Sequence, residues 1–295
     1  MTSAPLRVRS FAKINLALAV LGKRADGYHE IQTVLQTIDL HDDLEFRLSP
    51  DLRLDCVGLE GLATEDNLVW RSATALKNAL GETRGAEILL RKSIPVGAGL
   101  GGGSSNAAST LLGLCRLWTR ELSSRELGSL ARKLGSDVPF FLEGGTALGS
   151  GRGDEIQRLE DLPCACLVVV FPGFPVSTAN AYRSLSFELT SPLKANKIRG
   201  FCDQMRSHTG CLARIFNDFE TSILPAYPAI REAKDFLKQR GATATLLSGS
   251  GSAVFGFFDD EESTLAASRP AGRDEWRVFP AKTLSSADYF RRMFG

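Results

Sequence analysis

A run of small residues at positions 95–108, PVGAGLGGGSSNAA, constrains this chain more than any other segment. Five of the seven residues from 97 to 103 are glycine, and the run lies between a strand-like and a helix-like segment. Glycine lets the backbone turn its N–H groups toward a ligand, and the free amides that begin a helix attract an anion. The run therefore predicts a loop that holds phosphate groups. Its expected members are Pro95, Val96, Gly97, Ala98, Gly99, Leu100, Gly101, Gly102, Gly103, Ser104 and Ser105.

Two common phosphate-binding patterns match this loop only in part. Gly97, Gly99 and Gly102 have the spacing of the dinucleotide fingerprint, but a Rossmann unit also needs a second strand ending in an acidic residue about twenty positions later. Glu121 lies instead between two predicted helices. A Walker loop would need a lysine directly before Ser104, where this chain has glycine. A nicotinamide-dependent oxidoreductase remains an alternative, and the cation that neutralises the phosphates must come from elsewhere in the chain.

Hydrophobic periodicity predicts an α+β protein with two domains. The expected strands cover residues 8–20, 31–40, 44–48, 52–57, 86–94, 167–171, 245–258 and 276–281. The expected helices cover residues 67–80, 104 to before 122, 123–134 and 228–239. Asp66 or Asn67 is a plausible cap of the first helix, and Ser123 with Glu126 forms a capping box for the third. We place the domains at 1–155 and 156–295.

Composition narrows the class of protein. The chain has 295 residues, with 35 Lys and Arg against 34 Asp and Glu, so the formal charge of +1 gives little attraction to nucleic acid. The six cysteines include no CxxC pair, which favours free buried thiols over disulfides. No apolar run approaches the roughly 20 residues of a membrane span, and Asn15 interrupts the first apolar stretch. We therefore expect a cytoplasmic protein that binds neither nucleic acid nor a membrane.

Two clusters superficially resemble metal sites. Asp42 and Asp43 follow His41, and His208 lies three residues before Cys211. Neither cluster supplies a second pair of ligands, so we interpret the first as a solvated strand end and the second as a chance pairing. We expect no metal site built from protein ligands alone.

Three segments, in order over most of the chain, resemble the signature motifs of the GHMP small-molecule kinases. They are FAKINL at 11–16, the glycine-rich loop, and LSGSGSAVF at 247–255. The resemblance implies an N-terminal ATP-binding domain with a fold also found in a ribosomal protein, and a ferredoxin-like C-terminal α/β sandwich. It also implies ATP and Mg²⁺ as cofactors. An RNA-associated module is a further alternative, which the missing basic face disfavours.

Three other segments, at 24–30, 38–43 and 135–139, are similar to members of this family that act on a cytidine-diphosphate-linked methylerythritol. The resemblance implies transfer of the γ-phosphoryl group of ATP to the 2-hydroxyl of that small-molecule substrate, in the non-mevalonate route to isoprenoid precursors. Another alcohol acceptor remains possible within the family. A monomer or weak homodimer is expected.

The resemblance also assigns roles to individual residues. Asp137 would orient or deprotonate the acceptor hydroxyl, and Lys13 would supply positive charge to the transferred phosphoryl group. Tyr28 and His29 would hold the cytosine, with Tyr182 as a second aromatic ring and Asn15 on polar groups of the substrate. Asn67 and Lys92 would lie near the adenine, and the loop at 248–252 would fold against phosphates or substrate. For Asn67 a helix cap, for Lys92 a solvated strand position and for Tyr182 a helix-core ring are the competing interpretations.

Overall fold

Two long antiparallel strands form the centre of the first sheet. In the computed structural model, which describes residues 4–59, 61–185, 192–206, 211–269 and 272–295, β1 (Leu6–Lys23) pairs with β2 (His29–Ser49) along nearly their whole length. The predicted break in β2 at residues 41–43 is wrong, because a register shift at Phe11 and Ala12 lets this polar stretch continue the pairing.

Five further strands complete this seven-stranded sheet. The main order is β3-β4-β2-β1-β8, and β5 pairs with β2 and β6. These strands are β3 (Arg53–Val57), β4 (Gly85–Arg91), β5 (Thr146–Ser150), β6 (Glu155–Arg158) and β8 (Phe216–Asn217). β4 ends three residues earlier than predicted, because the amides of Ser93 and Ile94 donate to the carboxylate of Asp42 instead of to a strand.

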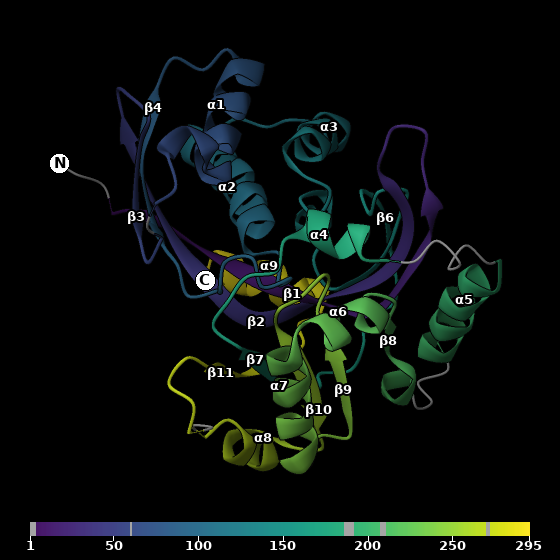
Figure 1. Cartoon of the computed structure of the whole chain (residues 1–295). Coiled ribbons are helices and arrows are strands. Elements are labelled where there is room, and N and C mark those ends of the chain that lie inside the picture. The colour runs from purple at the N-terminus through teal and green to yellow at the C-terminus, as the bar shows by residue number, and fades with distance from the viewer. Residues whose placement is uncertain (1–3, 60, 186–191, 207–210, 270–271) are drawn as a thin grey trace.

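Three helices cover one face of this sheet, in the upper part of Figure 1. They are α1 (Leu68–Leu80), α2 (Gly102–Trp118) and α3 (Ser124–Leu134), with the short helices η1 (Thr64–Asp66) and η2 (Pro139–Leu142) nearby. Asn67 caps α1 by accepting from the amide of Val69 at 2.9 Å, and the predicted capping box of Ser123 and Glu126 is present on α3. Both caps were therefore readable from the sequence.

The second sheet has the order β11-β7-β10-β9 and is antiparallel throughout. Its strands are β7 (Cys166–Phe171), β9 (Ala244–Leu247), β10 (Val254–Phe258) and β11 (Arg277–Lys282). Helices precede β9 and separate β10 from β11, which gives the strand–helix–strand–strand–helix–strand order of a ferredoxin-like fold. The predicted strand at 245–258 is wrong as one element, because the chain reverses in the loop at 248–253, between β9 and β10.

The remaining helices are α4 (Thr178–Arg183), α5 (Pro192–Arg206), η4 (Cys211–Arg214), α6 (Glu220–Ala226), α7 (Pro228–Gln239), α8 (Glu261–Ala267) and α9 (Ser286–Met293). α7 and α8 pack on strands of the second sheet, whereas α5 and α9 contact β1 of the first sheet. α7 has the predicted bounds. Because β6 and β8 belong to the first sheet and Tyr289 of α9 packs into its helical core, the second half of the chain crosses back repeatedly. The boundary between residues 155 and 156 stays a prediction.

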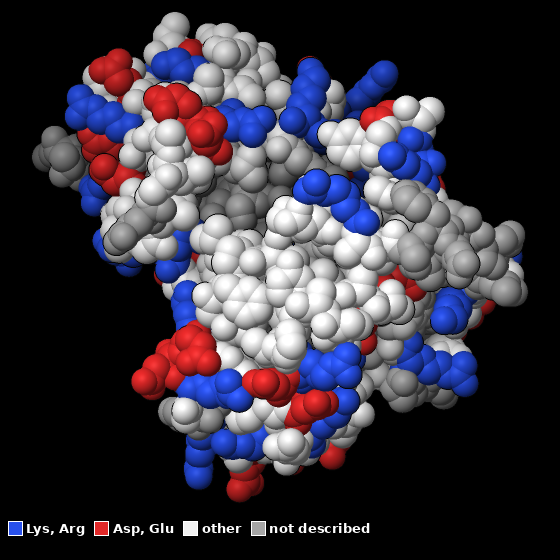
Figure 2. Space-filling model, viewed as in Figure 1, with Lys and Arg blue, Asp and Glu red and all other residues white. Residues whose placement is uncertain are grey.

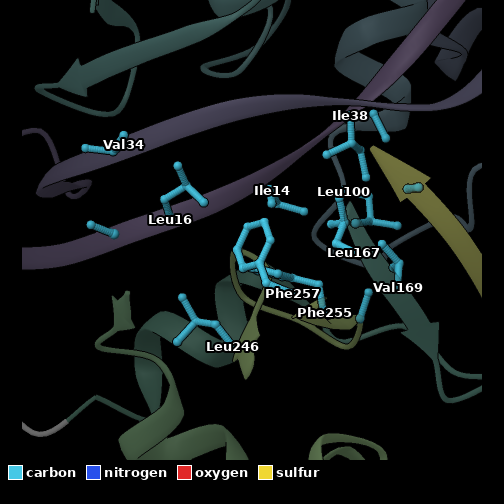
Figure 3. Packing of buried hydrophobic residues seen from close by; sticks show 14 of the residues in the cluster. Ile14, Leu16, Val34, Ile38, Leu100, Leu167, Val169, Leu246, Phe255 and Phe257 are labelled. Atoms are coloured by element: carbon cyan, nitrogen blue, oxygen red, sulfur yellow. The ribbon is translucent and has the colours of Figure 1, made fainter. Parts of the chain in front are cut away.

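The two sheets share a hydrophobic core, shown in Figure 3. Side chains alternate along a strand, so Leu167 and Val169 of β7 face β1 and β2, where Ile14 packs against them. Val168 and Val170 face the opposite side and pack against α7. Burial on both faces explains why β7 reads as an uninterrupted apolar run.

Within the described residues, no helix has the length and apolar character needed to cross a membrane. Cys56, Cys115, Cys164 and Cys166 are free thiols, as predicted, but none of them is fully buried: Cys164 is exposed and the other three are partly buried. The pairing of His208 with Cys211 lies outside the described side chains.

Candidate active site

A cleft of about 980 Å³ lies between the helical side of the first sheet and the end of the second domain. Figure 2 shows this hollow between the upper and lower parts of the molecule, with Lys and Arg side chains along its rim. Of the residues that the sequence predicts one by one for catalysis or for binding ATP or substrate, only Ser105 does not line it. The Ser105 hydroxyl is buried behind the loop and accepts from Ser10 at 2.8 Å.

The glycine-rich loop crosses the cleft and ends at the N-terminus of α2. Gly97, Gly99 and Gly101 have φ values of 66°, 79° and 69°, a region that disfavours other residues. A Cβ on Gly99 would lie 2.0 Å from the carbonyl oxygen of Ser248. Among the described residues no side chain caps α2, whose first residues line the cleft, so its amides and the positive end of its dipole are available to an anion.

The loop between β9 and β10 packs directly on the glycine-rich loop. The Ser248 hydroxyl donates to the Gly99 carbonyl at 2.9 Å, and the amide of Ala253 donates to the Ala98 carbonyl at 3.0 Å. Gly249 and Ser250 reach the cleft. The loop of the third motif therefore joins the second domain to the glycine-rich loop, whereas its expected contact with phosphates or substrate stays a prediction.

Lys13 and Asp137 meet inside the cleft. The alternation of β1 buries Ile14 in the core and turns Lys13 and Asn15 toward the cleft. The Lys13 ammonium nitrogen lies 3.7 Å from Oδ2 of Asp137 and donates to Oδ1 of Asn15 at 2.7 Å. Burial is the main cause that lowers the pKa of Lys13, and the charge of Asp137 acts in the opposite direction.

The two residues expected near adenine line the cleft, and each also has a structural partner. Asn67 caps α1 and donates to Sγ of Cys56 at 3.3 Å. Lys92 forms an ion pair with Asp42, and its ammonium also donates to Oδ1 of Asn106 at 3.1 Å. The side chain of Lys92 is only 6% exposed, so its interpretation as a solvated residue is wrong.

A second prediction, that residues 41–43 are a solvated strand end, is wrong for Asp42. It is fully buried and accepts from the amides of Ser93 at 2.7 Å and Ile94 at 2.8 Å and from the amide group of Asn106 at 2.9 Å. A buried carboxylate needs this kind of compensation. Asp42 is therefore an anchor where the chain enters the glycine-rich loop, whereas Asp43 is exposed as predicted.

Four aromatic side chains from three distant segments gather at the other end of the cleft. The rings of His29 and Tyr182 stack with their centroids 4.5 Å apart and their planes inclined by 13°. The edge of Phe219 supports Tyr182, and the guanidinium of Arg152 lies 4.9 Å from the ring centroid of Tyr28. Tyr28 is 57% exposed, which leaves a large aromatic surface for a ligand.

Burial shifts the pKa values of two of these side chains, His29 and Tyr182. Desolvation lowers the pKa of His29, and the nearby charge of Lys23 adds to this effect, which favours a neutral imidazole. Desolvation also raises the pKa of the Tyr182 phenol, with a smaller contribution from Asp137. His29 and Tyr182 therefore favour their neutral forms, which are suited to stacking and hydrogen bonding with a flat base.

Sequence reasoning missed several residues of the site. Arg152, Thr178 and Phe219 line the cleft from segments with no recognisable local pattern. Thr33, which accepts from Asn15 at 2.8 Å, sits on β2, where Gln32 and Gln36 are also polar. No local pattern therefore distinguishes Thr33, whereas Lys13 interrupts an apolar strand.

The strand order excludes the Rossmann alternative for the described residues. After α2 the chain continues into α3 and η2, and the next strand, β5, pairs antiparallel with β2. A dinucleotide-binding unit needs a parallel strand after its first helix. The described residues include no group of three or more His, Cys, Asp or Glu that could hold a metal ion.

Comparison with known proteins identifies similar sequences over most of the chain. The family model for the GHMP kinases N terminal domain matches residues 67–145, and the model for the GHMP kinases C terminal domain matches residues 193–273. The 4-diphosphocytidyl-2-C-methyl-D-erythritol kinase of Solibacter usitatus is 45% identical over 277 residues, or 92% of this chain and 87% of the relative. That of Prosthecochloris aestuarii is 44% identical over 280 residues, covering 94% and 97%.

A solved structure agrees with the sequence relatives. A crystal structure of 4-(cytidine 5'-diphospho)-2C-methyl-D-erythritol kinase superposes with a TM-score of 0.78 at 34% identity and covers 94% of this chain and 98% of its own. The similarity therefore extends over both sheets and the cleft between them.

Proposed function

This chain belongs to the GHMP kinase family, and from that premise we propose that it transfers the γ-phosphoryl group of ATP to the 2-hydroxyl of 4-(cytidine 5'-diphospho)-2-C-methyl-D-erythritol. As a kinase of this family it uses ATP. The proposed acceptor follows from the printed names of the relatives and from the aromatic end of the cleft.

One observation carries the proposed mechanism: Lys13 and Asp137 face each other between the free N-terminus of α2 and the aromatic group. In the proposed reaction the acceptor oxygen forms a bond to the γ-phosphorus, and the bond from that phosphorus to the β,γ-bridging oxygen breaks. The acceptor proton passes to the carboxylate of Asp137, and ADP leaves with the electron pair of the broken bond. The ammonium of Lys13 stabilises the negative charge on the transferred group.

The glycine-rich loop and Lys92 would bind the nucleotide. Amides at the N-terminus of a helix bind phosphate oxygens in many proteins, and those of α2 would do so here. Ser104 would add a hydroxyl. Asn67 and Lys92 line the cleft beyond the loop and would contact the adenine side. The cation missing from the loop itself would be supplied by Lys13 from β1.

Mg²⁺ fits this site as an ion held chiefly by the nucleotide. Such ions commonly use phosphate oxygens, waters and one or two protein oxygens, so a dedicated cage is not needed. Ser104 lines the cleft beside the loop, whereas the hydroxyl of Ser105 is already occupied by Ser10. We propose Ser104 as the protein contact, and the ion would neutralise phosphate charge.

The aromatic group would select the cytidine end of the acceptor. Tyr28, His29 and Tyr182 offer ring faces and a neutral imidazole, and stacking of a base on an aromatic ring is worth about 1–3 kcal/mol. Asn15 would contact polar groups of the acceptor near the reacting hydroxyl. Cytoplasmic location and a monomeric or weakly dimeric state complete the proposal.

The experiment is a substrate panel with the purified chain, ATP and Mg²⁺. We expect ADP and a monophosphorylated product with the cytidine-linked methylerythritol, and phosphorus NMR should place the new phosphate on the 2-hydroxyl. Homoserine and mevalonate, which carry no cytosine, serve as competing alcohols. A higher kcat/KM with either of them would refute the proposed acceptor but not the kinase chemistry.

A further inference from the structure

We propose that Asn217 is a positioning residue for phosphoryl transfer, because it fixes the loop between β9 and β10 against Lys13 and the glycine-rich loop. This inference rests on the proposed function, since it concerns the same reaction. Asn217 lies on β8, a two-residue strand that no motif marks, and it is absent from the residues that line the cleft.

The amide of Asn217 is buried, and its nitrogen and oxygen both bond to the backbone. Nδ2 donates to the carbonyl of Leu247 at 2.8 Å and to the carbonyl of Gly249 at 2.7 Å, and Oδ1 accepts from the amide of Phe219 at 3.0 Å. Its side chain therefore holds the backbone on both sides of Ser248 by hydrogen bonds. A side chain without two N–H groups could not hold both carbonyls.

The loop that Asn217 holds lies next to Lys13 in the cleft. The Ser248 hydroxyl bonds to the carbonyl of Gly99, and the α-carbon of Gly249 comes so near Lys13 that a Cβ there would lie 3.2 Å from the ammonium nitrogen. The same Cβ would lie 3.4 Å from Oδ1 of Asn15. A shift of Gly249 toward Lys13 would therefore displace the ammonium that faces Asp137.

The segment that carries Asn217 is itself held firmly to both sheets. β8 pairs with β1 at Ala17 and Leu18, and the carboxylate of Asp218 accepts from the amide of Val20 at 2.9 Å. Glu220 accepts from the amide of Leu247 at 3.0 Å and from Lys234 at 2.6 Å. Asn217 can therefore transmit the position of β1, where Lys13 lies, to the loop of the second sheet.

The same segment supports the aromatic end of the cleft through Phe219, whose ring meets Tyr182 edge-on with the centroids 4.9 Å apart. Asn217 and Phe219 thus support different ends of the site. Loss of the hydrogen bonds of Asn217 should lower kcat, and loss of the Phe219 ring should raise the KM of the cytidine substrate.

The test compares Asn217→Asp with Gln36→Glu in steady-state kinetics and thermal unfolding. Gln36 is a matched control, because its buried amide also donates to two carbonyls, those of Thr37 and Leu284, but outside the cleft. Both changes replace an amide by a carboxyl group of the same shape. Asn217→Asp should lower kcat by about tenfold to a hundredfold, since small displacements at a reacting centre cost this much.

The Gln36→Glu protein should lose thermal stability but keep a kcat close to that of the wild type. Equal losses of kcat in both variants, or an unchanged kcat in Asn217→Asp, would overturn the proposal. If Asn217→Asp does not fold, Ser248→Ala removes the link between Gly99 and the loop that Asn217 holds and should lower kcat in a folded protein. An unchanged kcat in Ser248→Ala would then overturn it.

Phe219→Leu completes the comparison. It should raise the KM of the cytidine substrate while the KM of ATP stays unchanged, and a fall in kcat alone would contradict the division of roles. The wild type separates the two proposals: if it phosphorylates another alcohol instead, the proposed acceptor fails, and the Asn217 comparison is made with that alcohol.

Discussion

The ammonium of Lys13 lies 3.7 Å from the carboxylate of Asp137, although 124 residues separate them in the chain. β1 presents Lys13, and the turn between α3 and η2 presents Asp137. Lys13 is buried, whereas the side chain of Asp137 is 35% exposed and can reach a ligand in the cleft.

Asp137→Asn should fold and bind ATP with nearly wild-type affinity but lose most of its turnover. The amide keeps the shape of the carboxylate and cannot accept the proton, and general-base catalysis is typically worth about 10²–10⁴-fold. Rapid-quench measurement of phosphoryl transfer together with nucleotide titration checks this. Near-normal turnover would remove Asp137 from the role of base.

The pH profile should report the buried state of Lys13. Its pKa is lowered from 10.5, so the charged form that the reaction needs is present below the lowered pKa and is lost as pH rises through it. The alkaline fall in kcat should therefore come at lower pH than for an exposed lysine. Lys13→Arg keeps its charge and should move that fall to higher pH, at a lower maximal rate. An identical alkaline limb in both proteins would assign it to another group.

Asp42→Asn should weaken both stability and ATP binding. It leaves Lys92 buried without its ionic partner and loosens the start of the glycine-rich loop, and breaking a buried pair costs about 3–5 kcal/mol. Urea denaturation and the KM of ATP are the measurements. The neighbouring exposed change Asp43→Asn should alter the free energy of unfolding by less than about 0.5 kcal/mol. Similar effects of the two changes would show that burial of Asp42 is not decisive.

Tyr28→Ala should raise the KM of the cytidine substrate and leave the KM of ATP unchanged. The exposed ring is expected to stack on the base, a contact worth about 1–3 kcal/mol. Phe290→Ala removes another exposed aromatic ring, one that lies outside the cleft, and is the control. A shift in the KM of ATP would relocate Tyr28 to the nucleotide side.

Gly99→Ala should damage the site more than Gly81→Ala. Both glycines have positive φ, but a Cβ on Gly99 would meet the Ser248 carbonyl at 2.0 Å, whereas a Cβ on Gly81 would meet no described residue within 4 Å. The strain at Gly81 alone should cost about 1 kcal/mol. We expect Gly99→Ala to lose more stability and to bind ATP weakly. Equal losses in thermal unfolding and unchanged ATP binding would contradict the packing described for the loop.

Local patterns were sufficient for the parts of the site that short segments build. The glycine run, the lysine inside an apolar strand and the cap at Asn67 are each visible within a few residues. Asp42 was misread because its partners Lys92 and Asn106 are 50 and 64 residues away, so no local pattern shows that its charge is buried.

The same reason explains the errors in the second domain. The segment at 245–258 is apolar at both ends, and only pairing with β7 shows where β10 begins. Asn217 gave no signal at all, because its two acceptor carbonyls belong to a loop about thirty residues later. The sequence predicts Ser105 as a hydroxyl of the phosphate-binding loop, but its position in the first turn of α2 directs this hydroxyl to Ser10.

The placement of both substrates is best tested by a crystal structure with a non-hydrolysable ATP analogue and the cytidine-linked acceptor. We expect phosphate oxygens on the main-chain amides at the start of α2, with the terminal phosphorus beside Lys13 and the 2-hydroxyl within hydrogen-bond reach of Asp137. A nucleotide bound away from the glycine-rich loop, or an acceptor hydroxyl far from Asp137, would contradict this placement.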